Sequence, residues 1–464
     1  MSGLFQGLEL GKRALLTHQV SLQTISHNIA NVDTEGYTRQ RVITTTTTPD
    51  TSANYSVGTG VTATDIRQVK DLFLGDQYRQ ENKSLGQWSY KEKTLSQIEA
   101  LYSEPADDTL SDRLNEFWSA WSDLAANPDS SSVRTEILSQ ANTLINSFHD
   151  MSSQLTRLQS SIDSDLVATV SEINLMLSDI ASLNHEIKVA EVGGVDANDL
   201  RDARDLVIDE LSGYLDVNTH ESSNGDMIVY VGSMAIVDGN EPHYIEAQTE
   251  NVDGNPRHIL VWEGTDIEVR NTNGKLKGII DSRDDIIPEQ LEELNLLAEA
   301  VVTQVNALHE TGTASSGQTA VSFFDPNYTN ASDIRINTAI TLDESLIMSG
   351  TSGEEGDNRV ALEIADLADA RVLDNGASSI SDYYNSMIGS LGVMTYEAQS
   401  FTSNYELLVN QVENARQSVE GVSLDEEMTN LVKFQHAYDA AARVITTMDE
   451  ALDTVISGMG IVGR

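Results

Sequence analysis

The chain has 464 residues, a net charge of −45 and no cysteine, and these numbers exclude several classes of protein. A chain this acidic is repelled by nucleic acid and by anionic membrane, so we expect neither as a partner. Without cysteine there are no disulfides, thiolate metal sites or cysteine nucleophiles. The length allows roughly two to four domains, and the low aromatic content of 6% favours helices with aliphatic seams over a β-sandwich.

The sequence shows neither a membrane span nor a secretory signal. No apolar run approaches the roughly 18 residues that a membrane-spanning helix needs. The polar stretch from Gly7 to Lys12 interrupts what would be the apolar core of a signal peptide, and no small-residue cleavage site follows it. The sequence therefore predicts a cytosolic protein, or one exported by a route that reads some other signal.

The first thirty residues predict a long amphipathic helix. Positions alternately four and three residues apart are apolar in six cases out of eight, which is the pattern of a coiled-coil seam. The other two positions are Gly11 and His18, and we interpret His18 as a packed or register-setting polar residue. We expect the helix to end between Ala30 and Gly36, where turn formers gather. Its apolar seam consists of Leu4, Leu8, Leu15, Leu22, Ile25 and Ile29.

The middle of the chain alternates between helical and extended patterns. Residues 70–185 have mostly helical periodicity. Within the following helical stretch, Arg201 and Asp205 stand four apart, a spacing that predicts a surface pair worth a few tenths of a kcal/mol. From 214 to 280 the period changes to two, with Asn-Gly and Asp-Gly turns, which predicts a small antiparallel sheet. Helical patterns then return from Pro288 onward.

The last forty residues predict a second long amphipathic helix. A buried Leu or Ile contributes roughly 1.5–3 kcal/mol, whereas ordering the backbone costs about 1–2 kcal/mol per residue. We therefore expect each terminal helix to need partners on more than one face, from the other end of the chain, from neighbouring copies, or from both. The alternative is that both are ordinary helices of one globular core. The predicted seam of the second helix contains Leu424, Met428, Leu431, Tyr438, Ile445, Leu452 and Ile456.

Together these patterns predict a mainly α fold in three parts. Residues 1–41 and 423–464 are terminal coiled-coil helices. Residues 42–212 and 281–422 form a discontinuous helical bundle, and residues 213–280 form a small antiparallel β domain inserted mid-chain. Because the chain leaves and returns through helices, we expect its two ends to lie together.

No set of titratable side chains predicts an active site. The nine histidines include no pair spaced four apart and no His-Glu-x-x-His motif, and the chain has no Gly-x-Ser-x-Gly elbow. Acidic clusters at 281–285 and 354–358 lack the ligand order of a calcium loop, so we interpret them as solvated charge or helix caps. We assign no catalytic residue, no metal ligand and no cofactor.

The end of the first predicted helix resembles a family signature. Residues 28–37 are similar to the Ala-Asn-x-x-Thr-Pro-Gly-Tyr sequence that closes the first helix of axial flagellar proteins, which include the rod, hook and hook-associated families. Glu35 stands where the signature usually has proline, which removes some rigidity from the turn. We expect Gly36 to adopt a positive φ angle. The matching residues are Ala30, Asn31, Thr34, Gly36 and Tyr37.

Four further segments resemble the hook-associated branch of that superfamily. They are residues 38–41 directly after the signature, residues 421–428 at the start of the last helix, and the interior segments 198–205 and 356–359. The resemblance implies a structural adaptor, not an enzyme, that polymerises between hook and filament through its terminal helices. Those helices would form the inner core of the axial structure, and the middle domains would point outward.

The resemblance also implies partners and a location. The partners would be identical subunits in a ring, the hook protein, the filament-side hook-associated protein and the flagellar export apparatus, and the protein would be extracellular after export without a cleaved signal peptide. Two alternatives remain: a hook or rod subunit of the same superfamily, or an extracellular helical adhesin or hydrolase built on the β insert. A cytoplasmic export chaperone would hold the last helix, with Leu424, Met428, Leu431 and Phe434 as candidate contacts.

Overall fold

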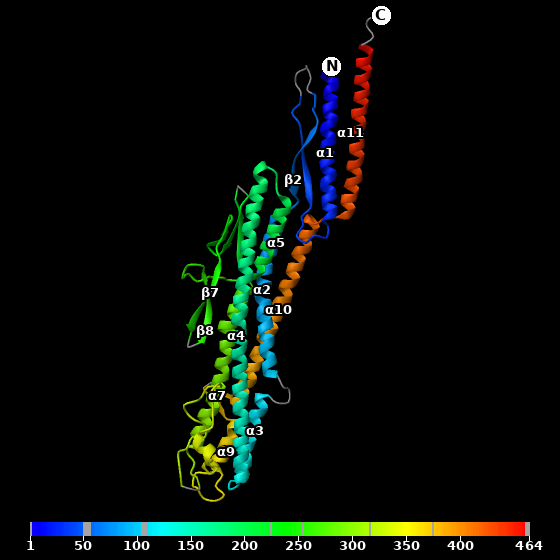
Figure 1. Ribbon diagram of the computed structural model, residues 1–464. Coiled ribbons are helices and arrows are strands. Elements are labelled where there is room, and N and C mark those ends of the chain that lie inside the picture. Colours follow the sequence, from blue (N-terminus) through cyan, green and yellow to red (C-terminus); the bar gives the residue numbers. More distant parts are fainter. Residues whose placement is uncertain are drawn as a thin grey trace.

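The computed structural model describes residues 2–49, 57–103, 109–222, 225–252, 255–314, 317–373 and 375–459. The predicted terminal segments therefore extend beyond the described part at Met1 and at 460–464. The molecule is long and narrow, with the two terminal helices side by side at one end and the other helices running along the same direction (Figure 1). The predicted fold class, mainly α with long terminal helices and small antiparallel sheets in the middle, is confirmed.

The terminal helices α1 (Ser2–Ala30) and α11 (Leu424–Met459) pack closely against each other. The first helix ends at Ala30, within the range expected from the turn formers. Two glycines of α1 set the close approach, because a Cβ added at Gly11 would lie 2.8 Å from the Ile445 side chain and one at Gly7 would lie 2.9 Å from the Met448 side chain. The two ends of the chain therefore meet, as the sequence predicted.

A β-hairpin packs beside α1. Its strands are β1 (Gln40–Thr46) and β2 (Val61–Gln68), and they pair antiparallel with Gln40 opposite Gln68. The helix turns polar side chains toward the hairpin, and the Thr17 Oγ1 lies 3.4 Å from the Val61 carbonyl oxygen. The strands β1 and β2 thus lie with the terminal helices, at one end of the molecule (Figure 1).

Long helices form the body of the molecule. The helix α10 runs along α2, α3 packs on α4, and α5 packs on both α2 and α4. A π-helical turn at Ser282–Ile286 joins α6 to α7. The helices are α2 (Leu72–Ser103), α3 (Leu110–Ala126), α4 (Ser131–Ala190), α5 (Asn198–Tyr214), α6 (Lys275–Asp281), α7 (Ile287–His309) and α10 (Ile380–Glu420).

The inserted β segment lies beside α4 and is made of a four-stranded antiparallel sheet and a separate hairpin. The sheet follows chain order, and alternate residues of its second strand, Met227, Val229 and Val231, are buried. The period-two pattern of the sequence therefore becomes a sheet with one covered face. Its strands are β3 (Val217–Glu221), β4 (Met227–Val231), β5 (Met234–Asp238) and β6 (Glu241–Pro242), and the hairpin is β7 (Ile245–Val252) with β8 (Asn255–Trp262).

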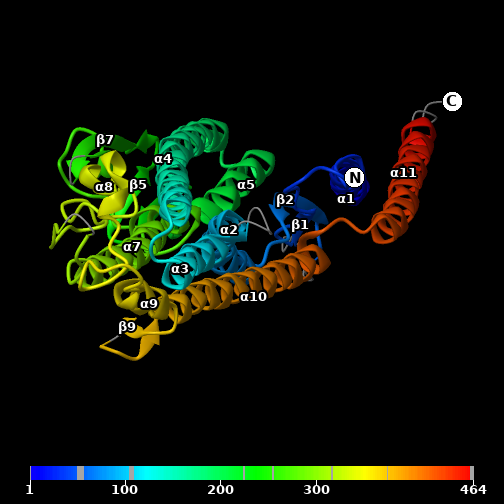
Figure 2. The ribbon, with the colours of Figure 1, turned by 90° about the horizontal axis from the view of Figure 1, so that it is seen from below.

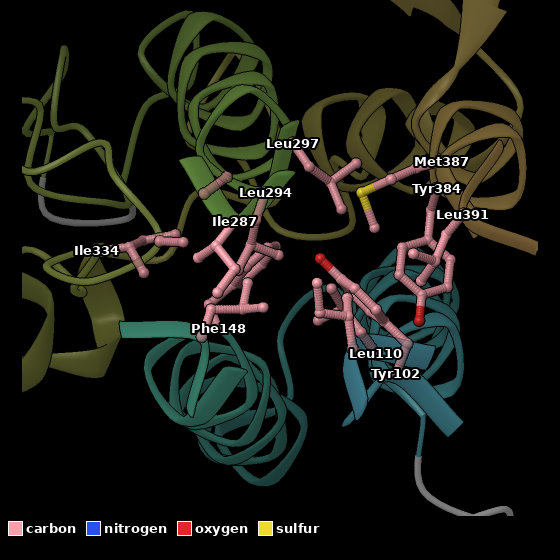
Figure 3. Close-up of a cluster of buried hydrophobic side chains, with 14 of the residues drawn as sticks. Tyr102, Leu110, Phe148, Ile287, Leu294, Leu297, Ile334, Tyr384, Met387 and Leu391 are labelled. Atoms are coloured by element: carbon pink, nitrogen blue, oxygen red, sulfur yellow. The ribbon is translucent and has the colours of Figure 1, made fainter. Parts of the chain in front are cut away.

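The end of the body farthest from the termini holds a tightly packed core. Figure 3 shows Phe148 of α4 next to Ile287 and Leu294 of α7, with Ile334 of the following loop closing the cluster. Side chains of α2, α3 and α10 complete the core on the other side. The short elements at this end are α8 (Thr338–Leu342), α9 (Arg359–Ala365), β9 (Arg371–Leu373) and β10 (Ser378–Ser379).

The stretch from Ser131 to Gly193, which contains α4, is long and apolar enough to cross a membrane by length and composition alone. Its apolar side chains recur at helical spacing and lie in the core, where Leu144, Phe148 and Leu155 are fully covered. Serine and other polar residues occupy the opposite face. We therefore interpret α4 as the central core helix of the bundle.

Candidate assembly interface

The contact face between α1 and α11 has a heptad period. Along α11, Glu427, Phe434, Ala441 and Met448 are spaced seven apart, and the Phe434 ring lies 5.9 Å from the ring of His18. Burial lowers the pKa of His18, consistent with a packed histidine. Of the predicted seam of α1, Ile25 is buried and four members are half-buried, while the side chain of Leu4 lies outside the described part. These four are Leu8, Leu15, Leu22 and Ile29.

The predicted seam of α11 divides between covered and uncovered residues. Tyr438, Ile445 and Leu452 are half-buried, as are Leu431 and Phe434. In contrast, Met428 is 50% exposed and Ile456 is 65% exposed, and Leu424 is similarly open. The helix pair also leaves Phe5 and Leu16 of α1 largely exposed. A single chain therefore pairs its terminal helices but leaves a large apolar surface uncovered on them.

The side-chain amide of Asn28 is the centre of a buried hydrogen-bond network at the end of α1. Asn28 is only 2% exposed, and its Oδ1 accepts from the Tyr37 hydroxyl at 2.8 Å and from the Gln40 N–H at 3.0 Å. Its Nδ2 donates to the Gln40 carbonyl at 3.0 Å and to the Glu427 carboxylate of α11 at 3.2 Å. One amide thus joins the turn, the hairpin and the last helix. Asn28 is not among the residues of the predicted signature.

The predicted signature residues form the turn after α1. The Asn31 Nδ2 donates to the His27 carbonyl at 3.0 Å, and its Oδ1 accepts from the Thr34 hydroxyl at 3.2 Å. Gly36 has a φ of 74°, so the expected positive φ is confirmed. Tyr37 packs edge-on against the His27 ring, and Ala30 is exposed. Side-chain hydrogen bonds therefore hold this turn, in which Glu35 stands where the signature usually has proline.

Carboxylates of α5 hold the segments that leave the turn. Asp202 accepts from the Thr38 N–H at 3.0 Å, from the Thr38 hydroxyl at 2.6 Å and from the Gln68 amide at 2.7 Å. Asp199 accepts from the Gln40 amide at 2.7 Å, and Asp205 pairs with Lys70. The first helical turns of α5 therefore clamp both strands of the hairpin to the body.

Arginines of the same helix hold the β insert. Arg201 makes two hydrogen bonds to Glu191, at 2.7 and 2.9 Å, and also pairs with Glu221 of β3. Arg204 is buried and donates to the Asn184 side chain at 2.9 Å and to the carbonyl of Gly225 at 3.0 Å. The expected pair between Arg201 and Asp205 is not the one that forms, because each has a better-placed partner on another element.

A second tie joins the turn to the link between α10 and α11. The Arg39 N–H donates to the Glu420 carbonyl at 2.8 Å, and its guanidinium binds Glu426 at 2.6 Å. The Glu420 carboxylate also accepts from the Asp71 N–H at 3.0 Å. The two segments that connect the helix pair to the body, near 38–40 and 420–423, are therefore fastened to each other.

Burial changes the ionisation of this junction. It raises the pKa of Asp202 to about 6, and the hydrogen bonds from Thr38 and the charge of Lys70 offset part of the effect. It also raises the pKa of Tyr37, with contributions from Asp199, Asp202 and Glu427. The junction is thus a largely buried, acidic network in which burial holds the pKa of one carboxyl group well above its ordinary value.

We expect the carboxyl group of Asp202 to titrate with a midpoint near pH 6. The folded chain then holds a proton that the unfolded chain releases near pH 4, so the ionised carboxylate lowers the free energy of unfolding. The free energy of unfolding therefore falls as pH rises from about 4 to about 6, by at most about 3 kcal/mol. Above about pH 6 this contribution stays constant. Carbon NMR of the carboxyl, assigned by its loss in Asp202→Asn, measures the midpoint, and a value near 4 would contradict the prediction.

The other interior segment of the resemblance lies at the far end of the molecule. Asp357 accepts from the N–H groups of Thr351 and Ser352, at 3.0 and 2.9 Å, and pairs with Arg359. Asn358 donates to the carbonyl of Ala125 at 2.6 Å. These bonds lower the pKa of Asp357. The segment therefore fastens a loop onto the end of α3 and is not part of the junction.

Comparison with known proteins first defines the class. A family model described as "Flagella basal body rod protein" matches residues 8–38, and one described as "Flagellar basal body rod FlgEFG protein C-terminal" matches residues 414–458. These ranges cover most of α1 with its turn, and nearly all of α11 with its link. The terminal helices are thus similar to those of the axial proteins of the flagellum.

The rest of the chain defines the family. A third model, "Flagellar hook-associated protein FlgK helical domain", matches residues 95–324. The flagellar hook-associated protein 1 of Bacillus subtilis (strain 168) is 34% identical over the full length of both chains. The protein of the same name from Escherichia coli (strain K12) is 23% identical over 98% of this chain and all of its own. The chain belongs to the flagellar hook-associated protein 1 (FlgK) family, whose members are structural flagellar proteins.

A solved structure shares the fold. The flagellar hook junction protein FlgK from Burkholderia pseudomallei has a TM-score of 0.67 and 16% sequence identity, and the match covers 74% of this chain and all of that one. The family model and the Bacillus subtilis relative therefore confirm the resemblance to the hook-associated branch, in preference to a rod or hook subunit.

Proposed function

We propose that the chain assembles as a ring of identical subunits between hook and filament, held together by α1 and α11. Residues 1–41 and 423–464 form the inner axial core in this proposal. The predicted bundle segments, 42–212 with 281–422, and the predicted β domain, 213–280, lie outside this core, and the hairpin of β1 and β2 lies directly against α1. The hook protein contacts one side of the ring, and the filament-side hook-associated protein contacts the other. The names of the relatives support this placement.

The uncovered apolar surface of the helix pair carries the proposal. Leu424, Met428 and Ile456 are exposed on α11 although they continue its heptad pattern, and Phe5 and Leu16 are exposed on α1. Surfaces of this kind on a long helix pair are buried by further helices. Neighbouring copies supply those helices, because every subunit presents the same pair.

The same surface suits an export chaperone before assembly. Leu424 and Met428 are exposed on α11, and Leu431 is half-buried. Phe434 packs against α1. A cytoplasmic chaperone that binds this end of α11 masks it from premature assembly. The flagellar export apparatus then delivers the chain to the outside of the cell, where the external flagellum is built.

We expect Gly36→Val to block assembly while the body stays folded. Valine at a φ of 74° is strained by about 1–3 kcal/mol, and its Cβ would lie 3.2 Å from the Leu206 side chain. The turn would then redirect α1 relative to α5. Gly264→Val is the matched control, because Gly264 has a φ of 71° and an added Cβ there meets no atom within 4 Å.

Motility and electron microscopy of cells measure the outcome. Cells with Gly36→Val should carry hooks without filaments and release unpolymerised flagellin, as should cells that lack the gene, and cells with Gly264→Val should swim. Motile Gly36→Val cells with intact filaments would count against the proposed role of the turn. A gene deletion that leaves filaments attached to hooks would count against the junction function itself.

A further inference from the structure

The outer face of α10 carries an exposed and uncharged surface with a coiled-coil period. From Gly389 to Asn414, eight positions at alternating spacings of four and three are free of charge. Val393, Tyr396 and Leu407 project from this face and are 66%, 73% and 68% exposed. We call these three residues the α10 ridge. These positions form an uncharged stripe, flanked by the exposed Glu397 and Glu406, on a chain with 73 acidic and 28 basic residues.

No described element covers the α10 ridge. Figure 2 shows α10 along one edge of the body, with α2 and α3 on its inner side. The buried residues of α10, which include Tyr384, Met387 and Leu391, face those helices. The ridge therefore lies on the opposite side of α10, and it runs toward the 421–423 link that leads into α11.

A groove on another face of the body can receive such a ridge. It has a volume of about 690 Å³ and lies where α2 and α4 diverge, with the end of α5 and the start of α6 at its floor. We call it the α2–α4 groove. Its apolar and aromatic lining includes Leu85, Tyr90, Ala168 and Tyr214.

The charges of the α2–α4 groove are largely satisfied within the chain. The Lys275 ammonium lies 4.8 Å from the centre of the Tyr214 ring and 3.6 Å from Glu172. The Lys93 ammonium lies 5.5 Å from the centre of the Tyr90 ring, whose hydroxyl donates to Asp165. With Glu210, the groove holds three carboxylates against two ammonium groups. It is thus much closer to neutral than the molecule as a whole.

We propose that the α10 ridge of each subunit packs into the α2–α4 groove of the next copy in the ring. Two acidic copies repel each other less where their facing surfaces carry little net charge, and the ridge and groove are such a pair. They lie on different faces, with α4 and α10 on opposite sides of α3 in Figure 2. A contact between unlike faces runs head to tail, and such contacts generate a ring when the rotation between copies closes. The proposal rests on the ring proposed above and names its outer contact.

Photo-crosslinking in assembled flagella tests this contact. The full chain carries a photoreactive phenylalanine analogue in place of Leu407, and a second strain carries it in place of Met428. We expect a covalent dimer from position 407, with the linked peptide in residues 85–93, 165–172 or 210–214. Products that join position 407 to another protein, or to another part of the second copy, would overturn the proposal, as would no product at all.

The Met428 strain separates this proposal from the ring itself. Dimers from position 428 without dimers from position 407 would refute only the ridge contact, whereas no dimers from either position would refute the ring.

In a second measurement, Tyr396→Glu with Leu407→Glu should lower the number of assembled subunits per hook by at least about tenfold, because the contact would bury two unpaired carboxylates. Leu342→Glu, at a similarly exposed residue of α8, should leave it unchanged.

Discussion

Replacing Asn28 by alanine is expected to release α1 and the hairpin from the last helix while the body stays folded. The substitution removes four hydrogen bonds made by one buried amide. It also removes a partner of the Glu427 carboxylate, which is 3% exposed. Net hydrogen bonds are worth about 1 kcal/mol each and a buried carboxylate without its partner costs more, so we expect a loss of about 3–5 kcal/mol at the junction.

Hydrogen exchange and motility together measure this loss. Amides of residues 37–40 should exchange faster in Asn28→Ala, amides of α4 and α7 should not change, and the cells should lose filaments. Asn142→Ala is the matched control, because Asn142 is exposed on α4 and its side chain donates to the carbonyl of Leu138 within the same helix. Unchanged exchange at residues 37–40 would show that Asn28 does not hold the junction.

Replacing Met428 by glutamate is expected to abolish assembly without changing the stability of the free subunit. Met428 is 50% exposed in the single chain, so a charge there should change the free energy of unfolding by no more than about 0.5 kcal/mol. In the ring the same position is covered by a neighbouring helix in our proposal. A carboxylate would then be buried without a partner, which costs several kcal/mol at every subunit contact.

Thermal unfolding of the purified chain and counts of attached filaments check both halves of this expectation. Leu175→Glu is the control, since Leu175 is an exposed aliphatic residue on α4 of the body. It should change neither property. If Met428→Glu cells assembled filaments normally, α11 would not use this face in the ring, and the exposed residues of the helix would need another explanation.

Much of this architecture could be predicted from the sequence, because it depends on local patterns. The end of α1 and the positive φ of Gly36 follow from a cluster of turn formers. The long terminal helices follow from apolar positions at alternating spacings, and the inserted sheet follows from a change of period to two. Each of these signals comes from residues close together in the sequence, so no knowledge of distant contacts was needed.

The pairing of the terminal helices could be predicted only in part. The face of α11 that meets α1 keeps Tyr438 and Ile445 of the predicted seam. It adds Phe434, Ala441 and Met448, whereas periodicity had placed Met428 and Ile456 in the seam instead. The difference depends in part on Gly7 of α1, which admits Met448 at close range. A glycine is not counted as an apolar contact position in such a pattern. The pattern therefore could not show which of two adjacent rows of side chains on α11 would face α1.

The junction network could not be predicted because its partners lie far apart in the chain. Asp202 binds Thr38 across 164 residues, and Asn28 binds Glu427 across 399. Acidic residues and arginines alternate closely at 198–205. This segment resembles the family, but its sequence does not say which residues these side chains contact. A spacing of four suggested that Arg201 and Asp205 pair with each other, whereas the fold offers each of them a buried or bidentate partner elsewhere.

Hydrogen exchange of the dilute, isolated subunit, compared with the assembled flagellum, tests the central claim most directly. If the terminal helices are only partly covered in one chain and depend on neighbours, amides of residues 1–35 and much of 425–464 exchange quickly in the free subunit, while α2, α4 and α10 are protected. The same terminal amides become protected on assembly. Protection of α1 and α11 in the free subunit equal to that of α4 would contradict the account.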